Sequence, residues 1–169
     1  TLVMAVRGIS LVAFLVVHCA INAMVYLNDG GIMFNKAAEF MAHNWFIRIS
    51  EIGLFAGLII HILQGLWLTA DNNAKRKNKY GVNASSANSK WYSRSMGLLG
   101  TIILLFLIIH LKDFWMVSRF DTQGGLTEEK TLYHFMIEAF ASPVAVSLYV
   151  LGCFSLAYHL LHGFSSAFQ

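Results

Sequence analysis

The chain has 169 residues, of which 57% are hydrophobic and only 12% are charged, and its formal net charge is +3. A soluble domain carries about 25% charged residues, so this composition excludes an ordinary water-soluble domain and predicts an integral membrane protein. The net charge is small, so its distribution along the chain matters more than its total, and we expect membrane lipid but no nucleic acid as a partner. The two cysteines, Cys19 and Cys153, lie in apolar runs without a CxxC pair, so we expect neither a disulfide framework nor a zinc site.

Four segments are apolar over the length that a helix needs to cross a membrane, which is about 20 residues. They cover approximately residues 2–27, 45–70, 95–117 and 143–163. The sequence therefore predicts an all-α integral membrane bundle in which residues 1–169 form a single domain. The first apolar run lacks a small-residue cleavage site at its end, so we expect a retained span and not a signal peptide.

The connections between these spans contain turn signals and one amphipathic segment. NDGG at 28–31 and DTQGG at 121–125 predict turns. The stretch TEEKTLYHFMIEAF at 127–140 is amphipathic with acids in its first turn, which favours an interfacial helix over a further span. Ser142-Pro143 is a typical helix start, because serine caps the first turn and proline fits inside it.

The orientation of the spans follows from the basic residues of the loops. The loop at 71–94 has one acid, Asp71, and six basic residues: Lys75, Arg76, Lys77, Lys79, Lys90 and Arg94. Loops rich in lysine and arginine stay on the cytoplasmic side. We therefore expect a multi-pass protein with this loop and the N-terminus in the cytoplasm.

Each span has one histidine well inside it: His18, His61, His110 and His159. Each lies about 24 Å along its helix, at 1.5 Å per residue. Because successive spans run in opposite directions, His18 and His110 (the outer pair) are predicted near the outer leaflet. His61 and His159 (the inner pair) are predicted near the inner leaflet.

Two facing imidazoles at one depth are the ligand set of a bis-histidine haem, since each ring gives one nitrogen to the iron. The alternatives are a histidine that bonds a neighbouring helix or a proton relay. Four histidines, one per span at matched depths, favour haem. His43, His134 and His162 lie near span ends, where we expect contact with water or propionates, and His162 is the most plausible substitute ligand.

Small residues lie on the same helix faces as the inner pair. Gly53, Gly57 and Gly65 share the i, i+4 spacing of His61, and Ser155 and Gly163 share that of His159. The glycines alone favour ordinary packing between membrane helices. Together with a histidine in each stripe, Gly57 and Gly65 predict a slot for a porphyrin.

Charged residues, together with polar and tryptophan side chains, form two candidate groups at the span ends. At the outer end, Arg48 and Glu51 begin the second span, and Lys112 and Asp113 end the third. At the inner end the group consists of Arg7, Ser10, Gln64, Trp67, Trp91, Arg94 and Ser95. Such residues commonly pair or anchor a helix at the headgroups. Arg48, Glu51, Arg94 and Ser95 are also candidates to bind haem propionates or a quinone.

Three runs of this sequence resemble one known family: HNWFIRISEIGLFAGLIIHILQGLWL, WYSRSMGLLGTIILLFLIIHLKDFW and HLLHGFSSAFQ. They are similar to the single-subunit dihaem cytochrome b anchor of bacterial succinate dehydrogenase and fumarate reductase. The resemblance covers nearly the whole chain, and HLKDFW together with HGFSSAFQ is its specific part.

This resemblance implies a membrane anchor with two b haems, held by His18 with His110 (distal) and by His61 with His159 (proximal). It implies two partners on the cytoplasmic face of the bacterial inner membrane, a flavoprotein subunit with covalent FAD and an iron–sulfur subunit. Electrons would pass between succinate and a membrane quinone, expected to be menaquinone. Succinate oxidation itself would take place in the partners, so we identify no catalytic residue in this chain.

Two features depart from the family. Its members have a fifth helix, whereas this chain stops at Gln169, so we expect a truncated chain. Some fumarate-reducing members have a glutamate two residues before the fourth ligand, where this chain has Ala157, which favours succinate oxidation. Three alternatives stay open: a dihaem subunit of another quinone-linked enzyme, such as a hydrogenase or formate dehydrogenase; a histidine-based proton channel or transporter; and an anchor that has lost its haem.

Overall fold

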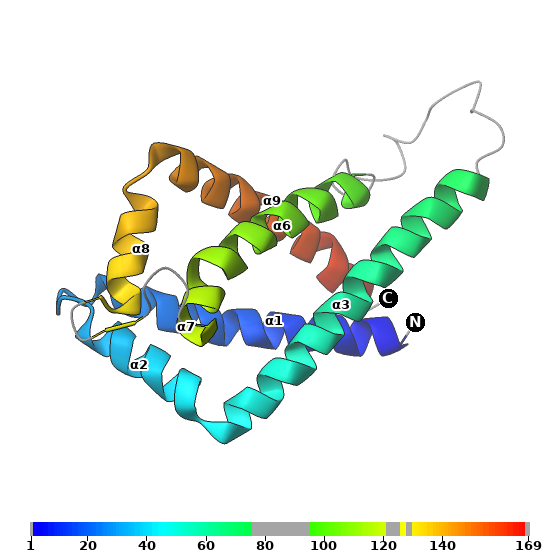
Figure 1. Cartoon of the computed structure of the whole chain (residues 1–169). Coiled ribbons are helices and arrows are strands. Elements are labelled where there is room, and N and C mark those ends of the chain that lie inside the picture. The colour runs from blue at the N-terminus through cyan, green and yellow to red at the C-terminus, as the bar shows by residue number, and fades with distance from the viewer. Residues whose placement is uncertain (1, 76–94, 121–125, 128–129, 168–169) are drawn as a thin grey trace.

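The computed structural model describes residues 2–75, 95–120, 126–127 and 130–167. Within these ranges every regular element is a helix, which confirms the all-α fold class (Figure 1). Four helical stretches are long and apolar enough to cross a membrane: Gly8–Tyr26, Trp45–Asp71, Met96–Phe120 and Pro143–Phe164. The protein is therefore a helical membrane protein, as its composition predicts.

The four long stretches occur where the sequence predicts spans. They are built from α1 (Leu2–Ala23) with the 3₁₀ turn η1 (Met24–Tyr26), α3 (Trp45–Lys75), α6 (Met96–His110) with its continuation, and α9 (Pro143–Ala167). The Asn44 side-chain oxygen accepts hydrogen bonds from the backbone N–H groups of Phe46 and Ile47, 3.0 and 3.3 Å away. This cap starts α3, and α9 begins at the proline of Ser142-Pro143.

The third span is not a uniform α-helix. After α6 the chain passes through a π-helical turn, η2 (Leu111–Trp115), into the short α7 (Met116–Phe120). A π turn holds an extra residue, so side chains beyond it point in other directions than an α-helix would give them. The sequence does not predict it, because nothing in the composition of this segment distinguishes a π turn from an α turn.

A short helix that the sequence does not predict, α2 (Ile32–His43), follows the NDGG turn. Its start is held by Asp29, whose carboxylate accepts hydrogen bonds from the N–H groups of Gly31 (2.9 Å) and Met33 (2.8 Å). These bonds hold the pKa of Asp29 below its usual value, and the bond from Met33 is the largest cause. The NDGG turn occurs as predicted, but the residues after it have mixed polarity and no clear helical period, so the sequence does not predict α2.

The amphipathic segment forms α8 (Leu132–Phe140), which starts later than the predicted residue 127. Thr127 and Lys130 instead close a turn: the Thr127 N–H bonds the Lys130 carbonyl, and the Lys130 N–H bonds the Thr127 hydroxyl. Thr131 is extended, so the helix begins only at the next residue. The acids at 128–129, which suggested the earlier start, lie outside the described residues.

The two short helices contact each other and close one end of the bundle, which we call the α2–α8 end (Figure 1). The Tyr133 N–H donates to the Asn35 side-chain oxygen at 3.1 Å, and the rings of Phe34 and Tyr133 are 6.4 Å apart. Gly31 has a φ of +85°, and a Cβ there would overlap the Tyr133 ring. Both the turn and the contact therefore require glycine at this position.

Within the described ranges, buried side chains are few and lie mostly toward the α2–α8 end. Among the described residues, the buried hydrophobic ones are Phe34, Leu99, Val117, Phe135, Met136 and Tyr149. Along the bundle, α9 packs against both α6 and α1, whereas α3 meets α1 and α6 over shorter stretches. Most described side chains of the four long helices are half-buried or exposed.

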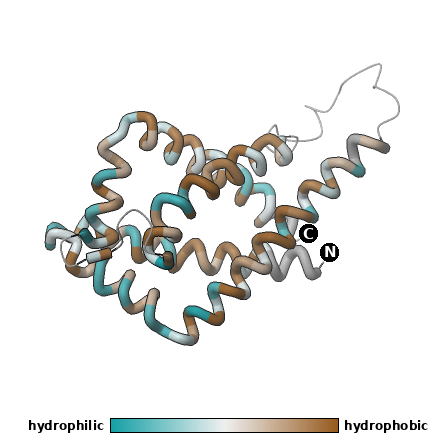
Figure 2. Tube along the Cα trace, in the orientation of Figure 1, coloured by the Kyte–Doolittle hydropathy of each residue, from teal (hydrophilic) through white to brown (hydrophobic). Residues whose placement is uncertain are grey.

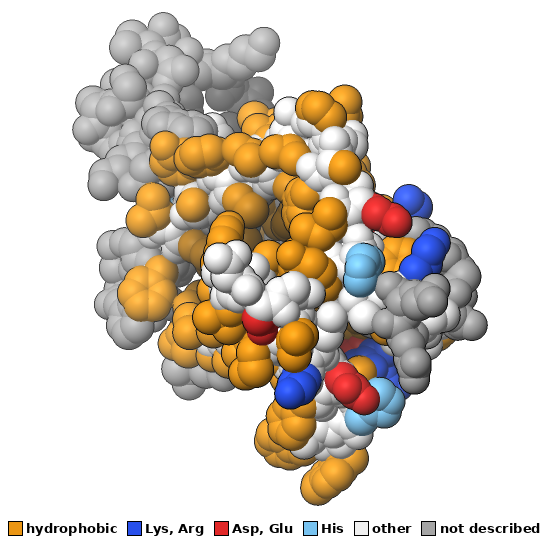
Figure 3. Space-filling model, turned by 90° about the vertical axis from the view of Figure 1, so that its left-hand side faces the viewer, with side chains coloured by type: hydrophobic (Ala, Val, Ile, Leu, Met, Phe, Trp, Pro, Cys, Tyr) orange, Lys and Arg blue, Asp and Glu red, His pale blue; other side chains and the backbone are white. Residues whose placement is uncertain are grey.

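The surface is largely apolar. Exposed fractions reach 65% for Val16, 72% for Ile52 and 62% for Phe154, and Figure 2 shows hydrophobic residues along α1 and α6 with more hydrophilic ones on α2. Viewed from the α2–α8 end, hydrophobic side chains surround a central hollow, while charged groups lie to its right and below it (Figure 3). Such a surface suits lipid and not water.

Candidate functional site

The outer pair lies together in the structure. His18 on α1 and His110, the last residue of α6, have ring centres 5.5 Å apart and ring planes at 84°. Phe14, one turn before His18, stacks on its ring at 5.4 Å. His110 is followed directly by η2, which contacts α8. This pair therefore lies toward the α2–α8 end.

The inner pair also lies together. His61 on α3 and His159 on α9 have ring centres 6.1 Å apart and ring planes at 74°. Gly100 on α6 faces this site, since a Cβ on it would lie 4.0 Å from the His159 Cε1 atom. The two contacts join the same histidines that the depth argument pairs, while their role as ligands stays a prediction.

The spacing of both pairs matches two imidazoles that share one metal ion. Two metal–nitrogen bonds of about 2 Å, plus about 1 Å from each nitrogen to its ring centre, put the ring centres about 6 Å apart. The observed separations of 5.5 and 6.1 Å are close to this value. Edge-to-face packing of two rings gives centre separations of about 4.5–7 Å, so the spacing fits a shared metal ion without requiring one.

Each pair also contains a nitrogen that lacks a partner. Among the described residues, the buried side-chain atoms without a hydrogen bond are Nδ1 of His110 and Nδ1 of His159. A buried unpaired nitrogen is costly, and either ring nitrogen of a neutral histidine can bind a metal. One member of each pair thus carries the kind of atom that a bound metal would satisfy.

The glycines of α3 leave open space on the face that carries His61. A Cβ added at Gly53, Gly57 or Gly65 would have no heavy atom within 4 Å. Gly57 and Gly65 lie one turn before and after His61, and His61 faces α9. This face therefore has room for a flat apolar group beside the inner pair, as the slot hypothesis requires.

Each pair consists of two imidazole side chains, the number of axial ligands that a bis-histidine haem takes from the protein. In the described part of the chain, no group of three or more histidine, cysteine, aspartate or glutamate side chains is arranged to hold a metal. A haem needs only two axial ligands from the protein, because the porphyrin supplies the other four. The residues present therefore fit a haem at each pair.

The remaining histidines differ from these four. His43 and His134 are exposed, and their Nδ1 atoms lie 3.0 Å from the Glu39 carbonyl and 2.9 Å from the Thr131 hydroxyl. His162 is half-buried in α9. None of the three is part of the two pairs.

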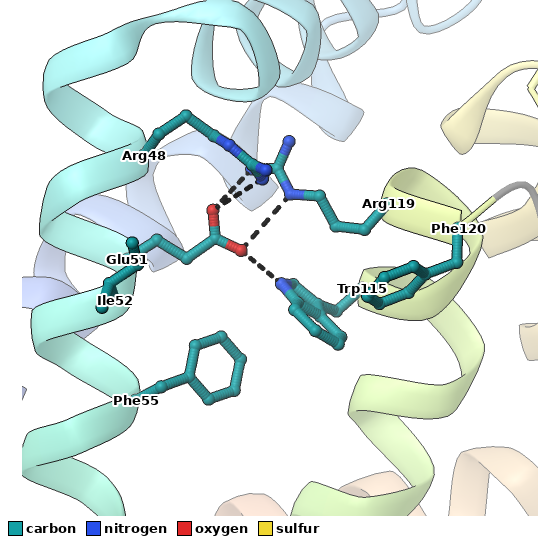
Figure 4. A pocket seen from close by; sticks show the side chains of 7 residues that line it. All are labelled: Arg48, Glu51, Ile52, Phe55, Trp115, Arg119 and Phe120. Atoms are coloured by element: carbon teal, nitrogen blue, oxygen red, sulfur yellow. Dashed lines mark hydrogen bonds and ion pairs between the residues drawn. The ribbon is translucent and has the colours of Figure 1, made fainter.

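The outer charged candidates form a network at one side of a pocket of about 310 Å³ (Figure 4). Glu51 pairs with Arg48 at 3.2 Å and with Arg119 at 2.8 Å, and it accepts a hydrogen bond of 2.5 Å from the Trp115 indole N–H. Arg119 also donates to the Ala42 carbonyl. The pocket is lined by Arg48, Glu51, Ile52, Phe55, Trp115, Arg119 and Phe120.

Two members of this network, Trp115 and Arg119, were missed from the sequence. The sequence pointed to Lys112 and Asp113 at this level, but these two pair with each other at 3.6 Å. Asp113 bonds Tyr149 on α9, whereas Trp115 bonds Glu51 on α3, and the sequence alone does not show which side of the third span faces which helix. The i, i+4 spacing of Trp115 and Arg119 places both side chains on one face of the span, and this spacing could have suggested that they share a partner.

The inner charged candidates do not join the outer ones. Ser95 is half-buried at the start of α6, at the other end of that helix from η2. Arg94 and most of the basic loop, residues 76–94, lie outside the described residues. The inner group therefore remains a prediction.

No protein-family model, curated protein or solved structure matches the chain. The family resemblance therefore rests on the sequence motifs alone.

Proposed function

We propose that the chain is a dihaem cytochrome b subunit, the membrane anchor of a bacterial succinate:quinone oxidoreductase. His18 and His110 would hold one b haem, and His61 and His159 would hold the other. The observation that carries the proposal is the presence of two histidine pairs with ring centres 5.5 and 6.1 Å apart. They lie in a bundle of four potential spans and contain one orphaned nitrogen each.

The helices would hold the four histidines in place, and the side chains around them would keep water away from the haems. The histidines come from all four spans, so each pair links two helices that are distant in sequence. Their neighbours are mainly aromatic and aliphatic, such as Phe14 and Phe106. When bound, the haems supply one-electron transfer. A low-dielectric, water-poor site favours the neutral imidazole that ligation requires.

The succinate part of the proposal is supported by the resemblance of HLKDFW and HGFSSAFQ to the family's anchor subunit. The partners would be a flavoprotein subunit with FAD and an iron–sulfur subunit, docked beside the basic loop at 71–94. The chain would then connect the iron–sulfur clusters to a quinone in the membrane, and it would hold the soluble subunits there.

The outer pocket is the candidate contact for the quinone, expected to be menaquinone. It combines aromatic walls from Phe55, Trp115 and Phe120 with the polar Glu51 and two arginines (Figure 4). A quinone ring needs an apolar, flat environment, and its two carbonyls accept hydrogen bonds. A haem propionate would use the same arginines, so both ligands stay candidates for Arg48 and Glu51.

The proposal is tested by purifying the chain with an affinity tag from its native membranes in mild detergent. We expect a b-type absorption spectrum, a co-purified subunit whose covalent flavin fluoresces in a denaturing gel, and succinate-dependent reduction of a menaquinone analogue. A b-type spectrum with neither covalent flavin nor succinate activity would reject the succinate assignment and favour another quinone-linked enzyme. A preparation without haem would reject the cytochrome itself.

A further inference from the structure

The π turn after His110 connects the outer pair to α9 through one buried tyrosine. Tyr149 on α9 is only 7% exposed. Its hydroxyl donates a hydrogen bond of 3.1 Å to Oδ2 of Asp113, which lies within η2. Asp113 also pairs with Lys112 at 3.6 Å. A carboxylate and a tyrosine hydroxyl in a membrane-spanning region are costly unless they are paired. The bond between Tyr149 and Asp113 gives each of these two groups a hydrogen-bond partner.

The ring of the same tyrosine is part of an aromatic enclosure around His110. Its centre lies 6.0 Å from that of His110 and 5.3 Å from that of Phe106. Phe106 stacks on His110 at 5.6 Å with planes at 25°, and Phe114 lies 5.5 Å away on the other side of the helix turn. The imidazole of His110 is therefore held by aromatic rings from before and after it in sequence and from α9.

Close approach of α9 makes this enclosure possible. A Cβ on Gly152 would lie 2.5 Å from the Phe106 ring, so only glycine lets α9 come this near. On the opposite side, Trp115 and Arg119 bond Glu51 on α3. The segment that follows His110 is thus bonded to two helices. Asp113 accepts a hydrogen bond from α9, and Trp115 and Arg119 donate hydrogen bonds to α3.

We propose that Tyr149 is a positioning residue for His110: its bond to Asp113 and its ring contact fix the rotation of that imidazole at the outer haem site. Asp113 contributes a second effect, because its negative charge favours the ferric over the ferrous state of a nearby haem. This inference rests on the proposed function, since it concerns the ligand geometry of the outer haem.

The test compares two variants that separate position from charge. Tyr149→Phe keeps the ring and removes only the hydroxyl. Asp113→Asn keeps an oxygen that accepts the Tyr149 hydrogen bond and removes the charge. Tyr26→Phe, at a side chain that is 89% exposed, and Glu138→Gln, at an exposed residue of α8, are the matched controls. The full chain is purified with whatever subunits accompany it.

The readouts are haem content, redox titration and the electron paramagnetic resonance spectrum of the ferric haems. The largest g value of a bis-histidine haem depends on the angle between its imidazole planes. The signal that persists in His61→Ala protein is assigned to the outer haem. We expect Tyr149→Phe to shift that signal or to lose the outer haem alone. We expect Asp113→Asn to keep the signal and to raise the midpoint potential of the outer haem.

An unchanged outer signal in Tyr149→Phe protein that retains two haems would overturn this inference and leave the proposed function intact. Equal shifts of both haems, or shifts as large in Tyr26→Phe, would overturn it as well, because they would indicate a general disturbance. Absence of haem from the unsubstituted protein would instead overturn the proposed function, and this inference with it.

Discussion

The imidazoles of His18 and His110 lie with ring centres 5.5 Å apart and planes nearly perpendicular, on the first and third potential spans. The second and fourth spans repeat this relationship between His61 and His159, at 6.1 Å. Because each pair uses different helices, the two pairs share no histidine. Loss of one pair should therefore leave the other in place.

Replacement of either inner histidine should remove one haem and not both. His61→Ala and His159→Ala are each expected to lower the haem content from two per chain to one, since a haem of this kind needs both axial nitrogens for stable binding. The measurement is haem per chain by pyridine haemochrome. His43→Ala, at an exposed histidine of α2, is the control and should keep both haems. Equal loss of both haems in the inner variants would contradict independent sites.

A large side chain at Gly57 should block the inner site without harming the helix. Nothing lies within 4 Å of a Cβ at this position, so Gly57→Leu has room in the protein without haem, and leucine is a better helix former than glycine. We expect a normal amount of protein in the membrane with the inner haem lost. Ala56→Leu is the control, because Ala56 is an exposed residue of α3 that lies five positions before His61 and thus on another face of the helix. Full haem content in Gly57→Leu would place the porphyrin elsewhere.

Loss of the Glu51 carboxylate should destabilise the protein more than loss of the Arg48 charge. The side chains of Glu51 and Arg119 are each only 15% exposed, whereas Arg48 is 51% exposed. Glu51→Gln weakens charge-assisted bonds to Arg119 and Trp115, at a cost of about 1–3 kcal/mol. Arg48→Gln should cost less than about 1 kcal/mol. Unfolding in mixed detergent–SDS micelles measures both, and equal effects would show that the network is no more than a surface pair.

The contribution of Asp29 to stability should disappear in acid. Its pKa is lowered in the folded protein, chiefly by the bond from the Met33 N–H. A group with a lowered folded pKa stabilises the protein above its unfolded pKa, and this contribution is lost as the pH falls through the folded value. Asp29→Ala should thus be less stable than the parent at neutral pH, with the gap closing below about pH 4. A gap that stays constant with pH would exclude the charged cap.

The pairing of the histidines could be predicted from the sequence, because a span crosses the membrane in one of two directions and has a fixed rise per residue. Depth along alternating helices is enough to group His18 with His110, and His61 with His159. The hydrogen-bond network around Glu51 could be predicted only in part. Trp115 and Arg119, four residues apart, both bond Glu51 on α3, but the sequence alone does not show which side of the third span faces α3.

The bounds of the short helices α2 and α8 were harder to predict from the sequence, for a different reason. The α2 helix is started by Asp29 and completed by contacts of Phe34 and Asn35 with Tyr133, which is distant in sequence. The start of α8 depends on a turn between Thr127 and Lys130 that competes with the helix. Both boundaries follow from tertiary contacts and local hydrogen bonds and not from hydrophobic periodicity.

The measurement that tests the central claim most directly is the amount of haem b per chain in the purified, unsubstituted protein. It combines a dithionite-reduced minus oxidised spectrum with pyridine haemochrome quantitation. Two b haems per chain is the predicted result, one for each histidine pair. A chain without haem would contradict the account, and the paired histidines would then have to be tested as a proton relay.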